Sequence, residues 1–294
     1  MTDLTLSHAH TKLDDLVLLT KIRLNALVVA TAAGGYYMAA PAVVDLSGLL
    51  VTCLGTALVA SGAAALNQVV ERDLDRMMIR TRVRPVAEGR MSVGEGRAIA
   101  LFLAGAGLVV LWAGATTAAA LVALATLLSY ILIYTPLKRR TSFSTVVGAV
   151  PGALPPIIGW AAAGGALSNA AGWSLFLLMF LWQLPHFLAI AWMFREDYAR
   201  AGLPMLPVVD PDGRLTSRQA LLWAATLIPM SELPFLLGLT GPAYAVAAVV
   251  LGLGLLTLAF RFMLRRSDEN ARALFYGSIT YLPLLWIVMA IGRR

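Results

Sequence analysis

The chain has 294 residues, of which 59% are hydrophobic and 13% are charged, with a net charge of +7 and a mean hydropathy of +0.78. Soluble domains carry about a quarter charged residues, so this composition excludes a disordered chain, a coiled coil and an ordinary soluble enzyme. A single cysteine, Cys53, excludes an intramolecular disulfide framework and a thiolate metal cluster.

The start of the chain is polar and carries Asp3, Asp14 and Asp15. A cleavable signal peptide has a basic start followed by a short apolar core, so we expect the first apolar run to remain as a membrane helix. Residues 1–15 are expected to form a polar cytoplasmic tail. The expected location is the cytoplasmic (inner) membrane of a prokaryote.

Apolar runs of roughly twenty residues, the length that crosses the ~30 Å hydrocarbon core of a bilayer, recur along the chain. They predict an all-α polytopic membrane protein with a single membrane-embedded domain over residues 1–294. Nine spans are predicted, at residues 17–39, 47–69, 97–114, 117–136, 143–163, 172–194, 218–239, 243–264 and 273–292.

The basic residues alternate between the two sides of this arrangement. Of the 23 lysines and arginines, 21 fall in the N-terminal segment or in the loops that follow the second, fourth, sixth and eighth spans. Positive residues stay on the cytoplasmic side, which predicts an N-terminus inside and a C-terminus outside. The net charge is therefore a sign of topology and gives no reason to expect a nucleic-acid partner.

The first polar cluster begins at the inner end of the second span. Asn67, Glu71 and Asp75 are spaced four residues apart, which places three oxygen ligands along one face of a helix. Oxygen ligands without Cys or His suit a hard cation such as Mg²⁺, which is held by one or two carboxylates, waters and substrate phosphate. Arg80 and Arg84, which follow, are natural partners of such a phosphate.

A solvated helix end is the alternative for this cluster, with ion pairs such as Glu71 with Arg72 and Asp75 with Arg76. Two observations favour the functional interpretation. Asn67 lies inside a predicted span, where polar groups are costly and often functional. A second, comparable cluster also follows later in the chain.

That second cluster contains Gln183 and His186 on one face of the sixth predicted span, with Glu196 and Asp197 just beyond it. His186 and Asp197 are eleven residues apart, or ~16 Å along a helix, so they are expected to line one cavity without binding one ion. The alternatives are a hydrogen-bonded interior histidine and a solvated helix terminus.

Further cations lie at the same predicted inner face. Tyr134 and Lys138 are four residues apart and Arg139 follows them, while Lys21 and Arg23 open the first span. Each of these groups alone is explained as an ordinary topology anchor. If the helices surround a central cavity, the cations meet both acidic clusters there. That arrangement suits a metal-bound diphosphate whose apolar tail extends into the bilayer, with the loops 70–96 and 195–217 forming the active site.

At these residues the sequence resembles the UbiA superfamily of intramembrane prenyltransferases, and within it the protohaem IX farnesyltransferase (haem O synthase) branch. The first family signature is matched by Asn67, Glu71, Asp75, Arg80, Thr81, Arg84 and Pro85. The family's basic loop is matched by Tyr134-Thr-Pro-Leu-Lys138-Arg139. The haem-branch form of the second motif is matched by Trp182-Gln-Leu-Pro-His186-Phe, with Asp197-Tyr198, Ala201-Gly202 and Met205-Leu-Pro207.

Quinone-type relatives have an aspartate where this chain has His186. The resemblance covers residues 16–292, and nine spans is the family architecture. One departure is Lys21-Ile22-Arg23, where the family usually has a proline between the cations. This difference is expected to alter how the first helix starts.

The resemblance implies transfer of the farnesyl group of farnesyl diphosphate to a vinyl group of haem B, with water completing the side chain of haem O. It implies Mg²⁺ as cofactor, with one ion held by Asn67, Glu71 and Asp75, and a second held by Asp197 with Glu196. The diphosphate would be bound by Lys21, Arg23, Arg80, Arg84, Tyr134, Lys138 and Arg139. Three roles stay open for His186: iron ligand, propionate partner or proton carrier. Besides the bilayer, haem A synthase or terminal-oxidase assembly are the expected partners.

Two other functions are compatible with parts of the sequence. A UbiA-type enzyme with another acceptor, such as an aromatic quinone precursor or a chlorin, is disfavoured by the sequence around His186. A transporter usually places charge near the bilayer midplane. The only acid well inside a span is Glu232, which is expected to be a local hydrogen-bonding group. Gly148 and Gly152 are expected to serve close helix packing.

Overall fold

A computed structural model describes residues 11–294, so the first ten residues of the predicted polar tail lie outside the described part. The described chain is helical apart from its turns and one isolated bridge between Thr240 and Arg293. Its elements in the first half are α1 (Lys12–Thr20), α2 (Ile22–Ala39), α3 (Leu46–Met77), α4 (Pro85–Glu88), α5 (Val93–Gly114), α6 (Thr117–Leu128), the π-helix η1 (Ser129–Tyr134) and α7 (Thr135–Leu137). Those that follow are α8 (Ser144–Ala153), α9 (Pro155–Ala162), α10 (Ala170–Met193), α11 (Arg195–Arg200), α12 (Leu206–Val209), α13 (Arg214–Ser231), α14 (Leu233–Leu236), α15 (Pro242–Leu264) and α16 (Asp268–Ile291).

Seven helices of residues 11–294 are long and apolar enough to cross a membrane, by length and composition. The pair α1 and α2 brings the number to eight if it is one span, bent by 42° at Lys21. The all-α membrane fold is therefore confirmed. The bend falls at Lys21-Ile22-Arg23, where the sequence departs from the pattern of the family that it resembles.

The count of nine spans is corrected by this result. The predicted span at 218–239 corresponds to α13 and the short α14, and α13 begins with the polar residues Arg214, Arg218 and Gln219. These residues lower its mean hydropathy below that of a typical span. The helix still packs along α10 and α15, so its place in the bundle comes from tertiary contacts.

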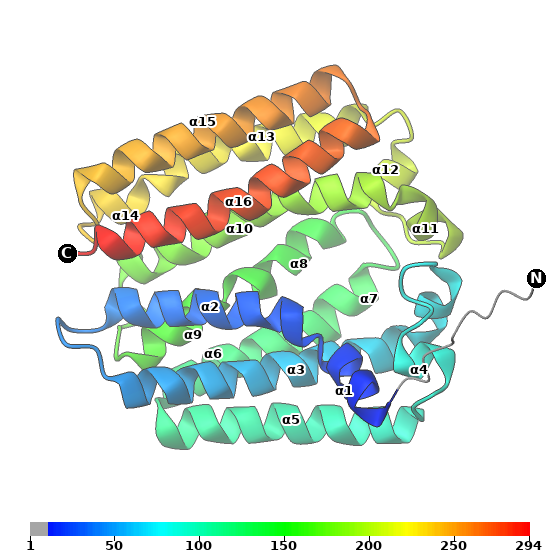
Figure 1. The fold of residues 1–294 in the computed structure, drawn as a ribbon, viewed down its shortest axis with the longest axis horizontal. Coiled ribbons are helices and arrows are strands. Elements are labelled where there is room, and N and C mark those ends of the chain that lie inside the picture. The colour runs from blue at the N-terminus through cyan, green and yellow to red at the C-terminus, as the bar shows by residue number, and fades with distance from the viewer. Residues whose placement is uncertain (1–10) are drawn as a thin grey trace, which may run out of the picture.

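The long helices form two groups (Figure 1). One group contains α2, α3, α5 and α6, and the other contains α10, α13, α15 and α16, with α8 and α9 between them. Large apolar side chains such as Leu50, Phe102 and Val250 are exposed on the outside. In a bilayer these side chains face lipid, because hydrocarbon replaces water as their surroundings.

Glycines let helices approach closely within the first group. A Cβ atom at Gly62 would lie 2.6 Å from the backbone nitrogen of Ala104, so α3 and α5 touch there through their backbones. Where α9 packs against α2, a Cβ atom at Gly159 on α9 would overlap the carbonyl oxygen of Ala32 on α2. Small residues give membrane helices this close contact, which holds α3 in a fixed position.

The first and last spans are joined at one end of the bundle. The Arg293 guanidinium donates to the carbonyl oxygens of Ala40 and Pro41 and lies 4.6 Å from the centre of the Tyr37 ring. The short helices α4, α11 and α12 lie at the opposite end (Figure 1). The predicted loops 70–96 and 195–217, which contain these helices, thus share one end of the molecule.

Candidate functional site

One face of α3 carries the predicted oxygen ligands, and that face is buried. Asn67, Glu71 and Asp75 are 4%, 3% and 0% exposed. Asp73 points outward, where it pairs with Arg72 at 3.4 Å and with Arg76 at 3.3 Å. The surface ion pairs of this helix end are therefore made by Asp73, while the two flanking carboxylates turn inward.

The Asp75 carboxylate binds the loop that follows its own helix. Arg84 Nη1 lies 2.8 Å from both carboxylate oxygens, and Thr81 Oγ1 donates to the Asp75 carbonyl oxygen at 3.1 Å. Arg84 is also the N-cap residue of α4, with Pro85 at the first helical position. Proline suits that position because its missing N–H would have no partner there. The helix start thus fixes the arginine beside the acid.

The Glu71 carboxylate pairs with Lys138, whose Nζ lies 3.3 and 3.2 Å from its two oxygens. Lys138 follows η1 and α7, where Pro136 lacks a backbone donor and interrupts the regular helix. The π-helix brings the rings of Tyr130 and Tyr134 into a stack with centroids 5.4 Å apart. Such wide turns are frequent at functional sites.

Gly148 and Gly152 make room for side chains beside this region. A Cβ atom at Gly148 would lie 2.5 Å from the Tyr134 ring, and one at Gly152 would overlap the Gln183 amide. The Gln183 Nε2 donates to the carbonyl oxygens of Ala149 and Met179. The expectation that both glycines serve close packing is confirmed.

Asp197, in the first turn of α11, is buried and binds the loop between α3 and α4. Its carboxylate accepts the backbone N–H groups of Ile79 at 3.2 Å and Arg80 at 3.3 Å, and it pairs with Arg200 at 2.8 Å. The Arg80 guanidinium lies over the Phe194 ring at 4.6 Å and donates to the hydroxyl of Tyr198.

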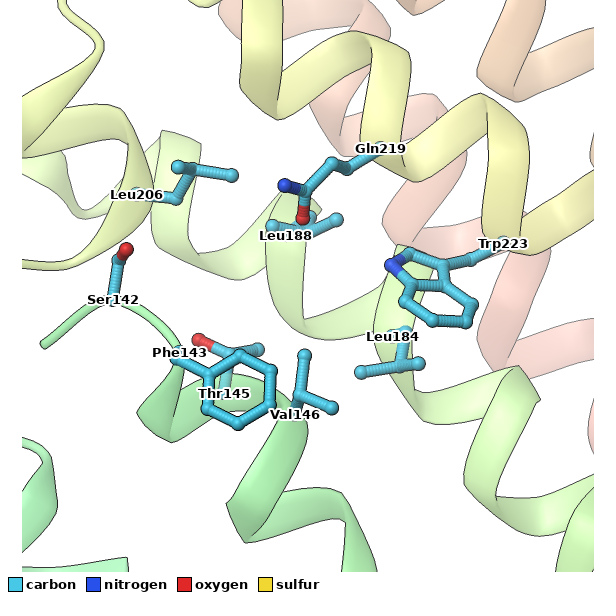
Figure 2. Close-up of a pocket in the computed structure, with 9 residues that line it drawn as sticks. All are labelled: Ser142, Phe143, Thr145, Val146, Leu184, Leu188, Leu206, Gln219 and Trp223. Atoms are coloured by element: carbon cyan, nitrogen blue, oxygen red, sulfur yellow. The ribbon is translucent and has the colours of Figure 1, made fainter.

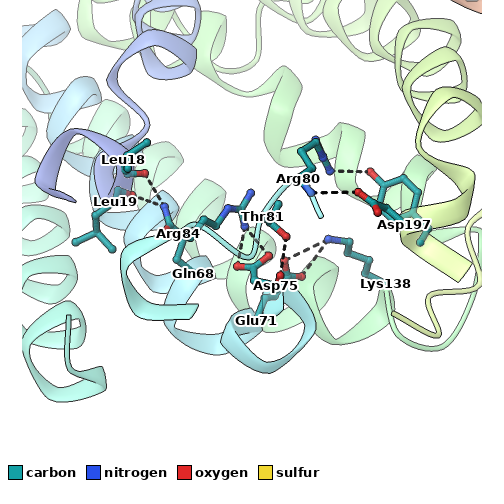
Figure 3. Close-up of polar contacts among 11 residues, drawn as sticks. Leu18, Leu19, Gln68, Glu71, Asp75, Arg80, Thr81, Arg84, Lys138 and Asp197 are labelled. Atoms are coloured by element: carbon teal, nitrogen blue, oxygen red, sulfur yellow. Dashed lines mark hydrogen bonds and ion pairs between the residues drawn. The ribbon is translucent and has the colours of Figure 1, made fainter. Parts of the chain in front are cut away.

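The two polar clusters are thus brought together (Figure 3). Residues 79–81 join them, since Ile79 and Arg80 bind Asp197 while Thr81 binds Asp75. Lys138 reaches Glu71 from a third segment of the chain. Three buried carboxylates and three cations therefore lie around one end of the bundle, namely Glu71, Asp75 and Asp197 with Arg80, Arg84 and Lys138.

Gln68 binds the chain next to the bend between α1 and α2. Its Nε2 donates to the carbonyl oxygens of Leu18 and Leu19 at 2.8 and 2.9 Å. These carbonyls belong to the last turn of α1, where the helix leaves acceptors without partners. Lys21 follows with a φ of 49°, the left-handed conformation that changes the chain direction.

Several predicted residues lie apart from these contacts. Arg23, Arg139 and Glu196 are exposed, and none of them makes an ion pair with a residue in the range 11–294. His186 contacts α16 through Ser278 and does not touch the acidic side chains.

Gln68 and Tyr130 were missed by the sequence reasoning, although a glutamine next to Asn67 inside an apolar helix was a usable signal.

The donor set fits a hard cation. Glu71 and Asp75 are buried carboxylates, and the Asn67 amide has no hydrogen-bond partner among the described side chains. Each carboxylate is paired with a cation or a backbone donor, and no three Asp, Glu, His or Cys side chains of residues 11–294 are grouped tightly enough to hold an ion. Mg²⁺ in proteins is normally held by one or two carboxylates together with waters and phosphate oxygens, and this donor set fits that pattern.

Two other features lie outside this site. Glu232 was expected to be hydrogen-bonded locally, but its buried Oε1 has no partner in the described part of the chain, so that expectation is wrong.

A small cavity of about 100 Å³ lies between α8, α10 and α13 (Figure 2). It is lined by Ser142, Phe143, Thr145, Val146, Leu184, Leu188, Leu206, Gln219 and Trp223. None of the predicted site residues lines it.

Similar sequences cover almost the whole chain. A protoheme IX farnesyltransferase of Solibacter usitatus is 46% identical over 288 residues, with 95% of this chain and 98% of that protein covered. A protoheme IX farnesyltransferase of Myxococcus xanthus is 45% identical over 280 residues, with 95% and 94% covered.

Solved structures share the fold. A structure of digeranylgeranylglyceryl phosphate synthase superposes with a TM-score of 0.79 at 17% identity, covering 96% of this chain and 98% of that one. A UbiA homologue from Archaeoglobus fulgidus bound to GPP and Mg²⁺ superposes with a TM-score of 0.64 at 16% identity, covering 94% and 99%. The sequence matches the UbiA prenyltransferase family over residues 27–286, and the chain belongs to that family.

Proposed function

We propose that the protein transfers the farnesyl group of farnesyl diphosphate to a vinyl group of haem B, forming haem O and releasing diphosphate. The observation that carries this proposal is the meeting of buried Glu71, Asp75 and Asp197 with Lys138, Arg84 and Arg80 at one end of a membrane bundle. Relatives that are 40–46% identical are named protoheme IX farnesyltransferases, which supports the choice of both substrates.

The reaction begins when the bond between the allylic carbon and the diphosphate oxygen breaks. The leaving diphosphate gains negative charge, and groups placed where charge develops lower the barrier. When bound, Mg²⁺ supplies positive charge to that diphosphate, and Asn67, Glu71, Asp75 and Asp197 are the residues that would hold it. Arg80, Arg84, Lys138 and Lys21 add further positive charge from three segments of the chain.

The acceptor then supplies the electrons. The vinyl carbon of haem B attacks the allylic carbon, and the resulting cation beside the porphyrin takes up water and loses a proton. The apolar helices protect the allylic cation from water before the attack. An amphiphilic donor and an apolar acceptor both dissolve in the bilayer, which explains why the site lies within a membrane bundle.

Location and partners follow from the same proposal. The protein is a multi-pass membrane protein. The proposed location is the cytoplasmic membrane of a prokaryote, with the N-terminus inside and the C-terminus outside, because 21 of the 23 basic residues then lie on the inner side. The product would pass to haem A synthase or to terminal-oxidase assembly.

The test uses the purified full-length protein with haem B, farnesyl diphosphate and Mg²⁺, followed by mass spectrometry of the porphyrin. A product heavier by one hydroxyfarnesyl unit is expected. The same assay is run with an aromatic quinone precursor and with a chlorin as acceptors. Unmodified haem together with a prenylated alternative acceptor would refute haem B as the substrate.

A further inference from the structure

His186 is held by three contacts that fix its ring in space. Its ring lies nearly parallel to the Trp182 ring, at 5.1 Å and 20°, and to the Phe275 ring, at 5.1 Å and 23°. Its Nδ1 lies 2.8 Å from Ser278 Oγ on α16. The stacked rings set the plane of the imidazole, and the Nδ1 contact sets its rotation within that plane. The direction of Nε2 is therefore fixed.

The hydrogen-bond partners of Ser278 decide which ring nitrogen carries the proton. Ser278 Oγ lies 2.6 Å from the carbonyl oxygen of Phe275, which is only an acceptor, so the hydroxyl hydrogen points to that oxygen. The opposite arrangement would leave two oxygen lone pairs facing each other at 2.6 Å. The hydroxyl must then accept from His186, which assigns the proton to Nδ1.

The remaining nitrogen, Nε2, is therefore an acceptor. It has no hydrogen bond to any residue of the described chain. His186 as a whole is half-buried beside Trp182 and Phe275. No carboxylate of residues 11–294 contacts the ring, so the neutral imidazole is the form that these surroundings support.

On the basis of the proposed function, we infer that His186 Nε2 is an axial ligand of the haem B iron, and that Ser278 is the positioning residue that keeps Nε2 free for the metal. A propionate partner would need an N–H group at this edge, which the tautomer does not provide. A neutral imidazole nitrogen is the usual protein ligand of haem iron.

The two hydrogen bonds that link His186 to Ser278 and Ser278 to the Phe275 carbonyl are the arrangement expected around a histidine that binds a metal. Histidines that bind metals almost always donate their other N–H to a second group, which fixes the tautomer and raises the basicity of the ligand. Here the hydroxyl links the imidazole to a backbone carbonyl, and Trp182 Nε1 ties α10 to α16 through the Ser278 carbonyl at 2.8 Å. The iron of the acceptor would thereby orient the porphyrin before prenyl transfer.

The experiment compares the binding of haem B with that of metal-free protoporphyrin IX to the full-length protein in detergent. Wild-type protein is expected to bind haem B at least about tenfold more tightly, the scale on which partners of metal-binding histidines act. Its ferrous complex is expected to show an iron–histidine band in resonance Raman spectra. His186→Ala should remove both the preference and the band.

Ser278→Ala tests the positioning role. It should reduce haem B affinity by about tenfold or more and shift the iron–histidine band, while protoporphyrin IX affinity stays unchanged. Ser278→Thr keeps the hydroxyl and should retain the preference, which separates a lost hydrogen bond from a damaged fold.

Equal affinity of wild-type protein for both porphyrins would overturn the inference and leave the proposed function standing if haem O is still formed. An unchanged preference in Ser278→Ala would overturn the role of Ser278. Failure of the wild type to bind either porphyrin would refute haem B as the acceptor. It would also refute the inference that His186 binds the haem iron.

Discussion

The Asp197 carboxylate accepts the backbone N–H of Arg80 at 3.3 Å, although 117 residues separate the two in the chain. This contact fastens the start of α11 to the loop that follows α3. Asp197 therefore has a structural role in addition to any role toward a metal ion, because it holds the loop that carries Arg80 and Arg84.

Asp75→Asn should reduce prenyl transfer by about 100-fold or more, the loss found when one well-placed electrostatic group is removed. The change removes the negative charge and keeps the size of the side chain. Asp73→Asn is the matched control, since Asp73 lies on the same helix with its side chain 67% exposed. Turnover and membrane insertion are measured for both. Normal turnover in Asp75→Asn, or equal loss in the two variants, would contradict a metal role for Asp75.

Asp197→Ala should loosen residues 79–80. The backbone amides of Ile79 and Arg80 lose their acceptor, so their hydrogen exchange should become faster. Exchange is followed by mass spectrometry on the full-length protein. Glu196→Ala is the control because that neighbour is exposed and should leave these amides unchanged. Slow exchange in Asp197→Ala would show that the loop is held by other contacts.

Lys138→Met should lower the free energy of unfolding by about 3 kcal/mol, because it leaves the buried Glu71 carboxylate without its cation. The double variant Glu71→Gln with Lys138→Met should recover much of that stability and stay inactive. Arg139→Met changes an exposed neighbour and should leave the free energy of unfolding unchanged. Thermal unfolding in detergent and turnover are measured together. Recovery of activity in the double variant would exclude a role for Glu71 beyond the ion pair.

Lys21→Gly should separate stability from activity. Lys21 is the one non-glycine residue with a positive φ in the described chain, and the left-handed conformation costs a lysine about 1–2 kcal/mol. Glycine removes that strain together with the ammonium group. Thermal stability should therefore equal or exceed that of the wild type, while the KM for farnesyl diphosphate rises. Lys21→Ala keeps the strain, so its thermal stability should stay near that of the wild type while its KM for farnesyl diphosphate rises; a less stable Lys21→Gly would contradict this account.

Much of this arrangement is predictable from local patterns. The spacing of Asn67, Glu71 and Asp75 identifies a helix face, and the alternation of basic residues places both acidic loops at one end. Local patterns do not predict which cation pairs with which acid. Asp75 pairs with Arg84 from the next loop and not with Arg76 on its own helix. Only the turn between α3 and α4 brings Arg84 near.

Other features have no strong signal in the sequence. Nothing in a lysine indicates a positive φ, so the 42° bend at Lys21 cannot be predicted from the sequence. The hydrogen bonds of Gln68 with the end of α1 beside this bend are likewise visible only in the structure. The place of α13 between α10 and α15 comes from packing that its hydropathy does not reveal. Ser278 carries one small hydroxyl in an apolar helix, and its role can be inferred only from its contact with His186 on α10.

The bond between Arg293 and the carbonyl oxygens of Ala40 and Pro41 has a mechanical consequence. It clamps the first and last spans together at the end remote from the acidic side chains. Any separation of α2 from α16 must then pivot on this clamp and be widest at the opposite end. A bulky ligand that enters sideways between these helices would therefore do so at the end of the bundle that holds Glu71, Asp75 and Asp197.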